Sequence, residues 1–402
     1  MAPEIAQTLE SSCYDCHSNQ TNLRWFDEIV PGYWLVVKDV NDGRARLNFS
    51  ELGLLPPPAQ RAALYEALNQ VRLGAMPPSQ YLLLHPDARV SAAQGKAWEN
   101  ALALPAGAVA GPVEVTVASP RPRGTVAAAP NGIAFPDDFV DWVPVSMTNR
   151  FDNHTVRLVL GNPVALRAIA QGQIRPWPDG ASFVKAAWSA GNEGARLVQI
   201  ELMTKDARAH ASTEGWGFAR WRGEALVPYG KDASFVEECT GCHAPVKNHD
   251  FVYTMPIGRG DGSDVWNAEA ALPAGLSVDP SGWRAIGASF VGNDGAGGSM
   301  TTKFGNDAAV AHARGSDTGA YPAGAILARV TWSEQADREW FGARIPGAPR
   351  SIEIVRFSAG DGGKVEPAYE SFDGTSAART TPADASVVGP LIQAIVGAPL
   401  AR

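Results

Sequence analysis

The sequence has few cysteines, no long apolar run and no excess of basic residues. No apolar stretch approaches the roughly 18 residues that a membrane-spanning helix needs. The 34 Lys and Arg residues are outnumbered by 42 Asp and Glu residues, which gives a net charge of −8. Contacts to phosphates require a basic surface. We therefore expect neither a membrane span nor a nucleic-acid partner.

The four cysteines of the 402-residue chain all lie in two copies of one motif. The copies are Cys13-Tyr14-Asp15-Cys16-His17 and Cys239-Thr240-Gly241-Cys242-His243. Because the two copies use every cysteine, coincidence is a poor explanation, and none is left for a structural disulfide. Each copy has the form C-x-x-C-H, the attachment signature of c-type haem.

Haem attachment requires these residue types at this spacing. The two thiols add to the vinyl groups of the porphyrin, and the adjacent histidine ligates the iron. A thiol–disulfide site does not need the trailing histidine, and a zinc site would need more ligands closer together. We therefore expect two covalently bound c-type haems, each with its iron, one on each motif.

Covalent haem attachment also indicates a location, because the reaction is normally carried out outside the cytoplasm. We therefore expect a periplasmic protein. Cys13 follows Met1 by twelve residues, and no apolar segment of a signal peptide precedes it. We expect the chain to be a mature form with a replaced start, so the location rests on the haem chemistry alone.

The residue pattern predicts several domains, as the length allows. Residues 1–104 have a mostly helical pattern, for example over 58–72 and 91–104, and we expect a haem-binding electron-transfer domain there. Residues 105–132 are rich in Pro, Ala, Gly and Val and predict an extended linker. Residues 133–260 contain strand-like runs separated by turns and end with the second motif.

Residues 261–402 repeat the preceding domain without its cysteines. At a constant offset of 144 residues, the identical pairs are Gly161 and Gly305, Asn162 and Asn306, Ala165 and Ala309, Pro178 and Pro322, Gly180 and Gly324, Ala181 and Ala325, and Trp188 and Trp332. The period is too long for a solenoid and indicates a tandem duplication. A copy without cysteine cannot hold c-type haem covalently. The apolar tail over 385–400 predicts a packing helix.

At the first motif, His17 is the expected ligand of the iron, and Met76 is the candidate for the opposite face. Met76 precedes Pro77 about sixty residues after the motif. A His/Met ligand pair raises the potential and suits electron transfer. One alternative is that Met76 only fills the core, the commoner role of methionine. The other is that His85 is the ligand, which would lower the potential.

Several further residues accompany the first motif. They are Ser18-Asn19, Trp25-Phe26, Gly43-Arg44, Leu47-Asn48-Phe49-Ser50, Met76-Pro77-Pro78, Tyr81 and His85. In this combination the first hundred residues resemble a family of small haem-binding domains.

At the second motif, His243 is the expected ligand, and the sequence offers no convincing ligand for the opposite face. Met255 follows His243 by only twelve residues, so we interpret it as a core residue. A haem with an open face binds small molecules. Lys185 stands in the otherwise apolar strand-like run 183–188, although lysine is depleted in strands and rarely buried. The alternative is a snorkelling lysine on an edge strand.

A second set of residues accompanies Lys185. They are Phe135-Pro136-Asp137, Trp142, Arg157, Asp179-Gly180, Val184, Glu201, Lys205-Asp206, Trp216 and Phe218. With the late haem motif, these residues make the segment 135–256 resemble cytochrome P-460. The resemblance implies that Lys185 is cross-linked to the porphyrin edge, that Glu201 relays protons, and that Arg157 steadies a bound N–O ligand. For Glu201 and Arg157, the alternative is a solvated strand face.

The predicted fold is multidomain α+β: an N-terminal, mostly α cytochrome c-like domain followed by two tandem antiparallel β-rich cytochrome P-460-like domains. The resemblance implies oxidation of hydroxylamine or a related small nitrogen compound such as nitric oxide. Electrons would pass to the N-terminal haem and then to an external redox partner. The alternative is a nitric oxide-binding or sensing cytochrome of the beta-type cytochrome c-prime kind, against which Lys185 argues. A pure electron carrier would need Met255 as a ligand.

The third domain allows a comparison within the chain. At the same offset, Arg329 replaces Lys185 and Thr301 replaces Arg157, and the haem motif is missing. We interpret the third domain as a degenerate, haem-free copy. Because the proteins that it resembles are homodimers, we expect it to pack against the second domain as an internal partner.

Overall fold

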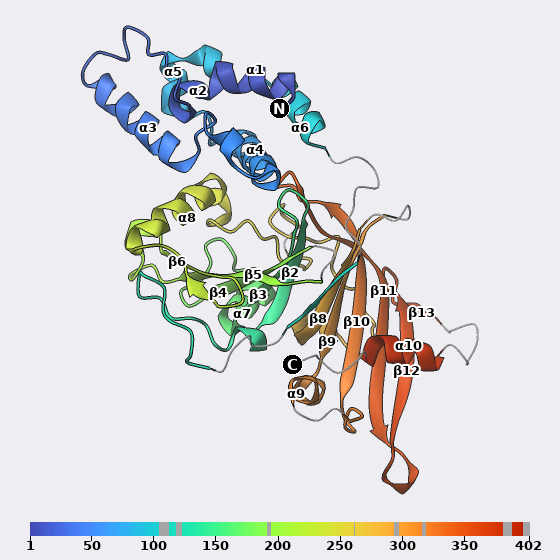
Figure 1. The fold of residues 1–402 in the computed structure, drawn as a ribbon. Helices are drawn as coiled ribbons and strands as arrows, with labels where there is room; N and C mark the ends of the chain where they lie inside the picture. Colours follow the sequence, from blue (N-terminus) through green and yellow to red (C-terminus); the bar gives the residue numbers. More distant parts are fainter. Residues whose placement is uncertain are drawn as a thin grey trace. The chain divides into compact units, whose positions relative to one another are not determined.

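A computed structural model describes residues 1–103, 112–117, 123–190, 194–260, 262–292, 297–315, 319–380 and 388–396. The chain divides into two compact units. The first comprises residues 1–106 together with the loop segments 151–153 and 337–343, and the second comprises the remainder. The first unit is helical and the second is rich in β-strands (Figure 1), which confirms the predicted fold class.

The first unit is built from short helices joined by turns. They are α1 (Pro3–Ser12), α2 (Tyr14–His17), α3 (Gly32–Arg46), η1 (Leu52–Leu54), α4 (Pro57–Arg72), α5 (Ser79–Leu84), η2 (Pro86–Ala88) and α6 (Ala92–Leu102). Local sequence explains two of the helix starts. Pro57 begins α4, where proline needs no N–H partner. Ser91 and Gln94 form a reciprocal capping box ahead of α6.

The core of the first unit joins its helices to a segment distant in sequence. Leu9, Tyr65, Leu68 and Trp98 are fully buried in it. The ring of Phe341 stacks on Tyr65 with 5.5 Å between centroids. The backbone of Phe341 is also held by Asn69, whose Nδ2 donates to the Phe341 carbonyl at 2.9 Å. The segment 337–343 thus belongs to this unit through packing that the predicted boundary at residue 104 did not include.

The second unit contains two repeats of the same strand and helix order. The first repeat has η3 (Phe139–Asp141), β2 (Val143–Arg150), β3 (Thr155–Gly161), α7 (Pro163–Gln171), β4 (Ser182–Ser189), β5 (Leu197–Lys205), η4 (Ala211–Thr213), β6 (Trp216–Arg222), β7 (Val227–Pro228), η5 (Ala233–Phe235), α8 (Val236–His243) and η6 (Ala244–His249). The second has η7 (Pro280–Gly282), β8 (Arg284–Val291), β9 (Ser299–Gly305), α9 (Asp307–Arg314), β10 (Ile326–Ala336), β11 (Ala343–Ala359), η8 (Asp361–Gly363), β12 (Val365–Asp373), β13 (Arg379–Thr380) and α10 (Val388–Val396).

Matching hydrogen bonds support the equivalence of the repeats. Asn162 caps α7 by accepting from the Ala165 amide at 2.9 Å, and Asn306 caps α9 by accepting from the Ala309 amide at 3.0 Å. Each cap also donates from Nδ2 at 2.8 Å to a glycine carbonyl, that of Gly180 or Gly324. The conserved offset of 144 residues therefore reflects one local design used twice.

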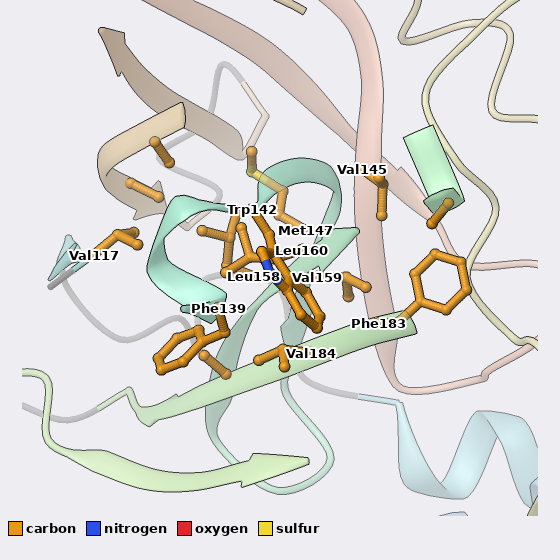
Figure 2. Close-up of a cluster of buried hydrophobic side chains, with 14 of the residues drawn as sticks. Val117, Phe139, Trp142, Val145, Met147, Leu158, Val159, Leu160, Phe183 and Val184 are labelled. Carbon is orange, nitrogen blue, oxygen red and sulfur yellow. The ribbon is translucent and has the colours of Figure 1, made fainter. Parts of the chain in front are cut away.

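One sheet runs through both repeats. The strand order is β1-β8-β9-β10-β11-β2-β3-β4-β5-β6-β7, with β12 and β13 continuing from β11 on a branch. One hydrophobic core is shared by both repeats, since it contains Leu158 and Trp221 of the first and Met300 and Trp332 of the second, and the second repeat has a further cluster of its own. Figure 2 shows part of it, where side chains of β2, β3 and β4 pack with Trp142.

The predicted linker requires a correction at its centre. Residues 113–116 form strand β1, which pairs antiparallel with β8. Val113, Val115 and Val117 are buried, because alternate side chains of a strand point to the same face. The composition of 105–132 suggested an unpacked segment, but every second residue from Val113 to Val117 is a valine that contributes to the core. The neighbouring residues 104–111 and 118–122 lie outside the described part of the chain.

Residues 388–396 of the predicted apolar tail form α10, and residues 385–387 and 397–400 lie outside the described part of the chain. α10 follows the antiparallel pair β12 and β13. In the first repeat, α8 follows the antiparallel pair β6 and β7 and carries the second haem motif. Ile392 and Ile395 of α10 are buried against Leu327, Val355 and Phe357. A three-residue step separates these isoleucines, as it separates Cys239 from Cys242. In the haem-free repeat, an apolar helix therefore follows the final hairpin in place of the haem-attachment helix.

No helix among the described residues is both long and apolar enough to cross a membrane.

Candidate haem sites

The first motif lies where α1 meets α2. Cys13 ends α1, and His17 is the last residue of α2. The Nδ1 of His17 donates a hydrogen bond to the Leu47 carbonyl at 2.9 Å, which orients the ring and leaves Nε2 as the ligating atom. Gly43 of α3 passes so close to the motif that a Cβ there would lie 2.8 Å from the Cys16 carbonyl oxygen.

The thiols of the two motifs are not the activated kind: Cys239 is buried, and Cys13, Cys16 and Cys242 are partly buried. Burial raises the pKa of Cys13 to about 12 and that of Cys239 to about 11. A thiol–disulfide enzyme needs the opposite, a cysteine with a depressed pKa. Among the described residues, no cluster of His, Cys, Asp and Glu side chains could hold a metal ion by itself. The raised pKa values of the thiols disfavour a thiol–disulfide site.

The structure places Met76 and His85 in different surroundings. Met76 is 37% exposed, so its thioether is accessible. His85 is 3% exposed, and its Nε2 lies 2.9 Å from Oδ1 of the buried Asp27. The ring of Tyr81 also stacks on His85 at 4.0 Å between centroids. Because Asp27 engages the usual ligating nitrogen of His85, Met76 is the better candidate for the first iron.

The first unit fits a large apolar cofactor. Of the fourteen exposed large apolar side chains in the described chain, twelve lie between residues 1 and 84. They include Trp25, Ile29, Val30, Tyr33, Trp34, Leu35, Leu83 and Leu84. Soluble domains rarely expose so much apolar surface unless something covers it. These side chains, with Cys13, Cys16, His17 and Met76, are the residues that would hold a haem.

The second motif lies on α8, with Cys239 buried and Cys242 half-buried. The Nδ1 of His243 donates to the Phe251 carbonyl at 2.7 Å. The ring of Phe218 lies 5.2 Å from the His243 ring, and Tyr253 lies 5.3 Å from it on another side. Burial lowers the pKa of His243 to about 4. The ring is therefore neutral at pH 7, the form that ligates iron.

Three charged residues form a row across three strands. Lys185 on β4 pairs with Glu201 on β5, which in turn pairs with Arg220 on β6. Directly paired residues share one face of a sheet. Lys185 Nζ lies 2.5 Å from Glu201 Oε2, and Arg220 Nε lies 3.0 Å from Glu201 Oε1. The next row along the same face is apolar and consists of Phe183, Met203 and Phe218.

Arg157 joins the charged row from β3. Lys185 pairs with Val159 of β3, and Arg157 lies two residues before Val159, so its side chain shares that face. Arg157 is 8% exposed, and its Nε donates to Thr155 Oγ1 at 3.2 Å. The structure thus brings together Lys185, Glu201 and Arg157, the three predicted catalytic residues.

The charged groups of this row shift one another's pKa values and also the pKa of His243. Burial acts to raise the pKa of Glu201, but Lys185, Arg220 and Arg157 outweigh it and hold that pKa well below its usual range. Burial lowers the pKa of Lys185, and the Glu201 carboxylate opposes this effect. The charges of Lys185, Glu201 and Arg220 also act on the pKa of His243. The row and the second motif therefore belong to one site.

The second site also fits a haem. Glu201 Oε2 is buried and pairs with Lys185 Nζ at 2.5 Å. The Lys185 side chain is 33% exposed although both of its strand neighbours are buried. Cys239, Cys242 and His243 would hold the haem, with Lys185 as the candidate cross-link. Met255 is only 6% exposed, as expected for a core residue.

The haem-free repeat retains part of the charged row. Arg329 pairs with Glu353 in the register position of Lys185 and Glu201. Two bonds of 2.6 and 2.8 Å join the Arg329 guanidinium to the Glu353 carboxylate, and Tyr369 donates to Glu353 at 2.8 Å. The constant offset of 144 hid this match, because Glu353 follows Arg329 by 24 residues whereas Glu201 follows Lys185 by only 16.

Sequence reasoning did not single out Arg220. The signal was available, since Arg220 stands between Ala219 and Trp221 in a mostly apolar strand, as Lys185 does in its own. The hydrogen bond from His243 to the Phe251 carbonyl could not be predicted from the sequence, because every residue has a backbone carbonyl.

Comparison with known families agrees with this geometry. Residues 1–102 match the family model of a haem-binding domain, and residues 136–254 match the family model of cytochrome P460. No curated protein matched the chain. Both predicted resemblances are confirmed, and the chain is a haem cytochrome that joins a haem-binding domain to a cytochrome P460 domain.

Proposed function

We propose that the protein is a periplasmic, dihaem c-type cytochrome that oxidises hydroxylamine, or a related small nitrogen compound, at its second haem. The observation that carries this proposal is the row Lys185–Glu201–Arg220 on the strand face that reaches His243. A protein that only carries electrons needs no ion-paired lysine and carboxylate beside its haem. A catalyst that removes protons together with electrons does.

The chemistry calls for a proton acceptor beside the iron. Each hydroxylamine oxidised to the level of nitrous oxide releases two electrons and two protons. When bound, haem supplies an iron that accepts electrons from a coordinated small molecule. Glu201 is ionised at neutral pH and can accept the protons. Arg157 and Arg220 supply positive charge that would orient the oxygen of the substrate.

A cross-link at Lys185 would change the basicity of Glu201. The ammonium of Lys185 is the strongest influence that lowers the pKa of Glu201, while burial acts to raise it. A covalent bond between the Lys185 nitrogen and the porphyrin would remove that ammonium charge. The pKa of Glu201 would then rise, and the carboxylate would become a stronger base. The cross-link would therefore complete the catalytic site as well as alter the haem.

The electrons need an exit, and the N-terminal domain is the proposed acceptor. His17 and Met76 would give its iron a raised potential, so electron flow from the second haem is favourable. An external redox partner would then reoxidise the protein. The haem-free repeat, which shares a core with the catalytic repeat, would serve as its internal partner in place of a second subunit.

Mass spectrometry of haem peptides tests the proposal directly. We expect a proteolytic fragment in which one haem joins the peptide of Cys239 and Cys242 to the peptide of Lys185. A second fragment should carry haem on Cys13 and Cys16 alone. A haem on Cys239 and Cys242 that is not bound to Lys185 would remove the main support for turnover and favour the nitric oxide-binding alternative.

Turnover provides an independent test. A Lys185→Leu variant should lose hydroxylamine oxidation while keeping both haems. The matched control is Lys303→Leu, which removes a partly buried strand lysine from the haem-free repeat and should leave turnover unchanged. Full turnover by Lys185→Leu would sink the proposal.

A further inference from the structure

Asp250 joins three segments that are separate in the sequence. Its Oδ1 accepts from Lys205 Nζ at 2.8 Å and from Trp216 Nε1 at 3.3 Å. Its Oδ2 accepts from the Trp177 amide at 2.8 Å. The side chains of Lys205 and Asp250 are only 8% and 12% exposed. One buried carboxylate thus ties the turn after α8 to the end of β5, the start of β6 and the loop ahead of β4.

The backbone at this turn adopts an uncommon conformation. Asp250 and Phe251 have φ angles of 48° and 65°, in the left-handed region that costs free energy for residues other than glycine. Two bonds of 3.1 Å close the turn, from the Asp250 amide to the Lys247 carbonyl and from the Phe251 amide to the Val246 carbonyl. Such a conformation persists only where surrounding contacts hold it, and the Asp250 carboxylate supplies three of them.

The consequence of the turn is the position of one carbonyl group. The left-handed pair aims the Phe251 carbonyl at His243, where it accepts from Nδ1 at 2.7 Å. At the first motif, the equivalent acceptor is the Leu47 carbonyl at 2.9 Å, and Leu47 has ordinary extended backbone with φ −152°. The left-handed turn and its buried ion pair are therefore features of the second motif.

We propose that Asp250, held by Lys205, is a positioning residue that sets the reduction potential of the second haem through His243. A hydrogen bond from the free nitrogen of a ligating histidine makes the ring a more basic ligand. A more basic ligand stabilises oxidised iron and lowers the potential. Loosening the turn weakens the bond and raises the potential. The proposal rests on haem ligation by His243, which is part of the proposed function, and not on the identity of the substrate.

Two single variants of the full-length haem protein test the proposal. Asp250→Asn removes the charge but keeps a residue that tolerates the left-handed region and can still accept from the Trp177 amide. Lys205→Met removes the cation and leaves the turn sequence intact. We expect both variants to raise the midpoint potential of the second haem and to lower the iron–histidine stretching frequency in the reduced protein. The double variant should shift neither value further than the larger single effect, because both changes break the same pair.

The controls separate positioning from folding. Asp232→Asn alters an exposed aspartate that caps the short turn ahead of α8 and should leave the potential unchanged. The first haem gives an internal reference in every sample. Variants that lower the melting temperature but shift neither the potential nor the stretching frequency would show a purely structural role and overturn the proposal. If Asp250→Asn does not fold, Lys205→Met alone tests the proposal. A midpoint potential of the second haem that is unchanged in Lys205→Met then overturns it. Absence of haem on Cys239 and Cys242 in the unmodified protein would instead overturn the proposed function.

Discussion

Glu353 occupies in the haem-free repeat the register position that Glu201 occupies in the haem-binding repeat. Each glutamate pairs across strands with a cation, Arg329 for Glu353 and Lys185 for Glu201. The bidentate Arg329–Glu353 pair is a closed structural contact. Glu201 instead contacts two different cations, Lys185 at 2.5 Å and Arg220 at 3.0 Å. The same carboxylate position therefore holds one arginine in one repeat and joins a lysine to an arginine in the other.

The two glutamates should respond differently to the same substitution. Glu201→Gln leaves Lys185 without its carboxylate partner and Arg220 with only Glu238, at 3.5 Å, and Glu353→Gln leaves Arg329 without its partner. Each should lower the free energy of unfolding by about 1–3 kcal/mol, because a buried charged group loses its partner. Urea unfolding measures both losses. Only Glu201→Gln should change the visible spectrum of the second haem, and an equal spectral change in Glu353→Gln would contradict the assignment of the site.

The contribution of Glu201 to the free energy of unfolding should decrease as the pH is lowered. Lys185, Arg220 and Arg157 hold the pKa of Glu201 below its ordinary value of 4.5 in the folded protein that carries no cross-link. A lowered carboxyl pKa gives stability that is fully present above about pH 4.5 and is lost as the pH falls through the folded-state pKa. The difference in unfolding free energy between the wild type and Glu201→Gln should therefore be constant near neutrality and shrink on acidification. A difference that grows below pH 4.5 would show that the sign is wrong.

Substitutions of Met76 and His85 should have different effects, the first on ligation of the iron and the second on the stability of the fold. Met76→Ala should abolish the absorption signature of a sulfur-ligated ferric iron and lower the potential of the first haem. His85→Gln should preserve that signature but lower the free energy of unfolding by about 1–3 kcal/mol, because the buried Asp27 loses its partner. Absorption spectra and chemical unfolding of the two variants distinguish the roles. A loss of the signature in His85→Gln would identify His85 as the ligand.

The helix α10 should stabilise the haem-free repeat through its buried isoleucines. Ile395 is fully buried against the sheet, so Ile395→Ala should cost about 2–5 kcal/mol of unfolding free energy. Gln393 is exposed on the same helix, and Gln393→Ala should change stability by less than about 0.5 kcal/mol. Both variants should retain two haems by mass. Equal stability of the two variants would mean that α10 does not pack as described.

Some of the site could be predicted from the sequence because its signals are local. The paired C-x-x-C-H motifs, the isolated Lys185 in an apolar strand and the repeated Asn162 and Asn306 caps are all visible as residue types at fixed spacings. The register that makes Lys185 face Glu201 and Arg220 is not visible in this way. Register depends on which strands pair and where the connecting loops end. Glu201 and Arg220 are 16 and 35 residues from Lys185 in sequence and lie in one row with it only because β4, β5 and β6 pair in this register.

The sequence by itself determined two motifs for covalent haem attachment and a third domain without one, because each motif consists of residues adjacent in the chain. Tertiary structure decided how each motif histidine is held. The Phe251 carbonyl accepts from His243, and the neighbouring Asp250 carboxylate binds Lys205 across the fold. It also decided that Phe341 packs on Tyr65 in the first unit, far from it in sequence. Such contacts depend on the packing of buried groups that the order of residues does not display.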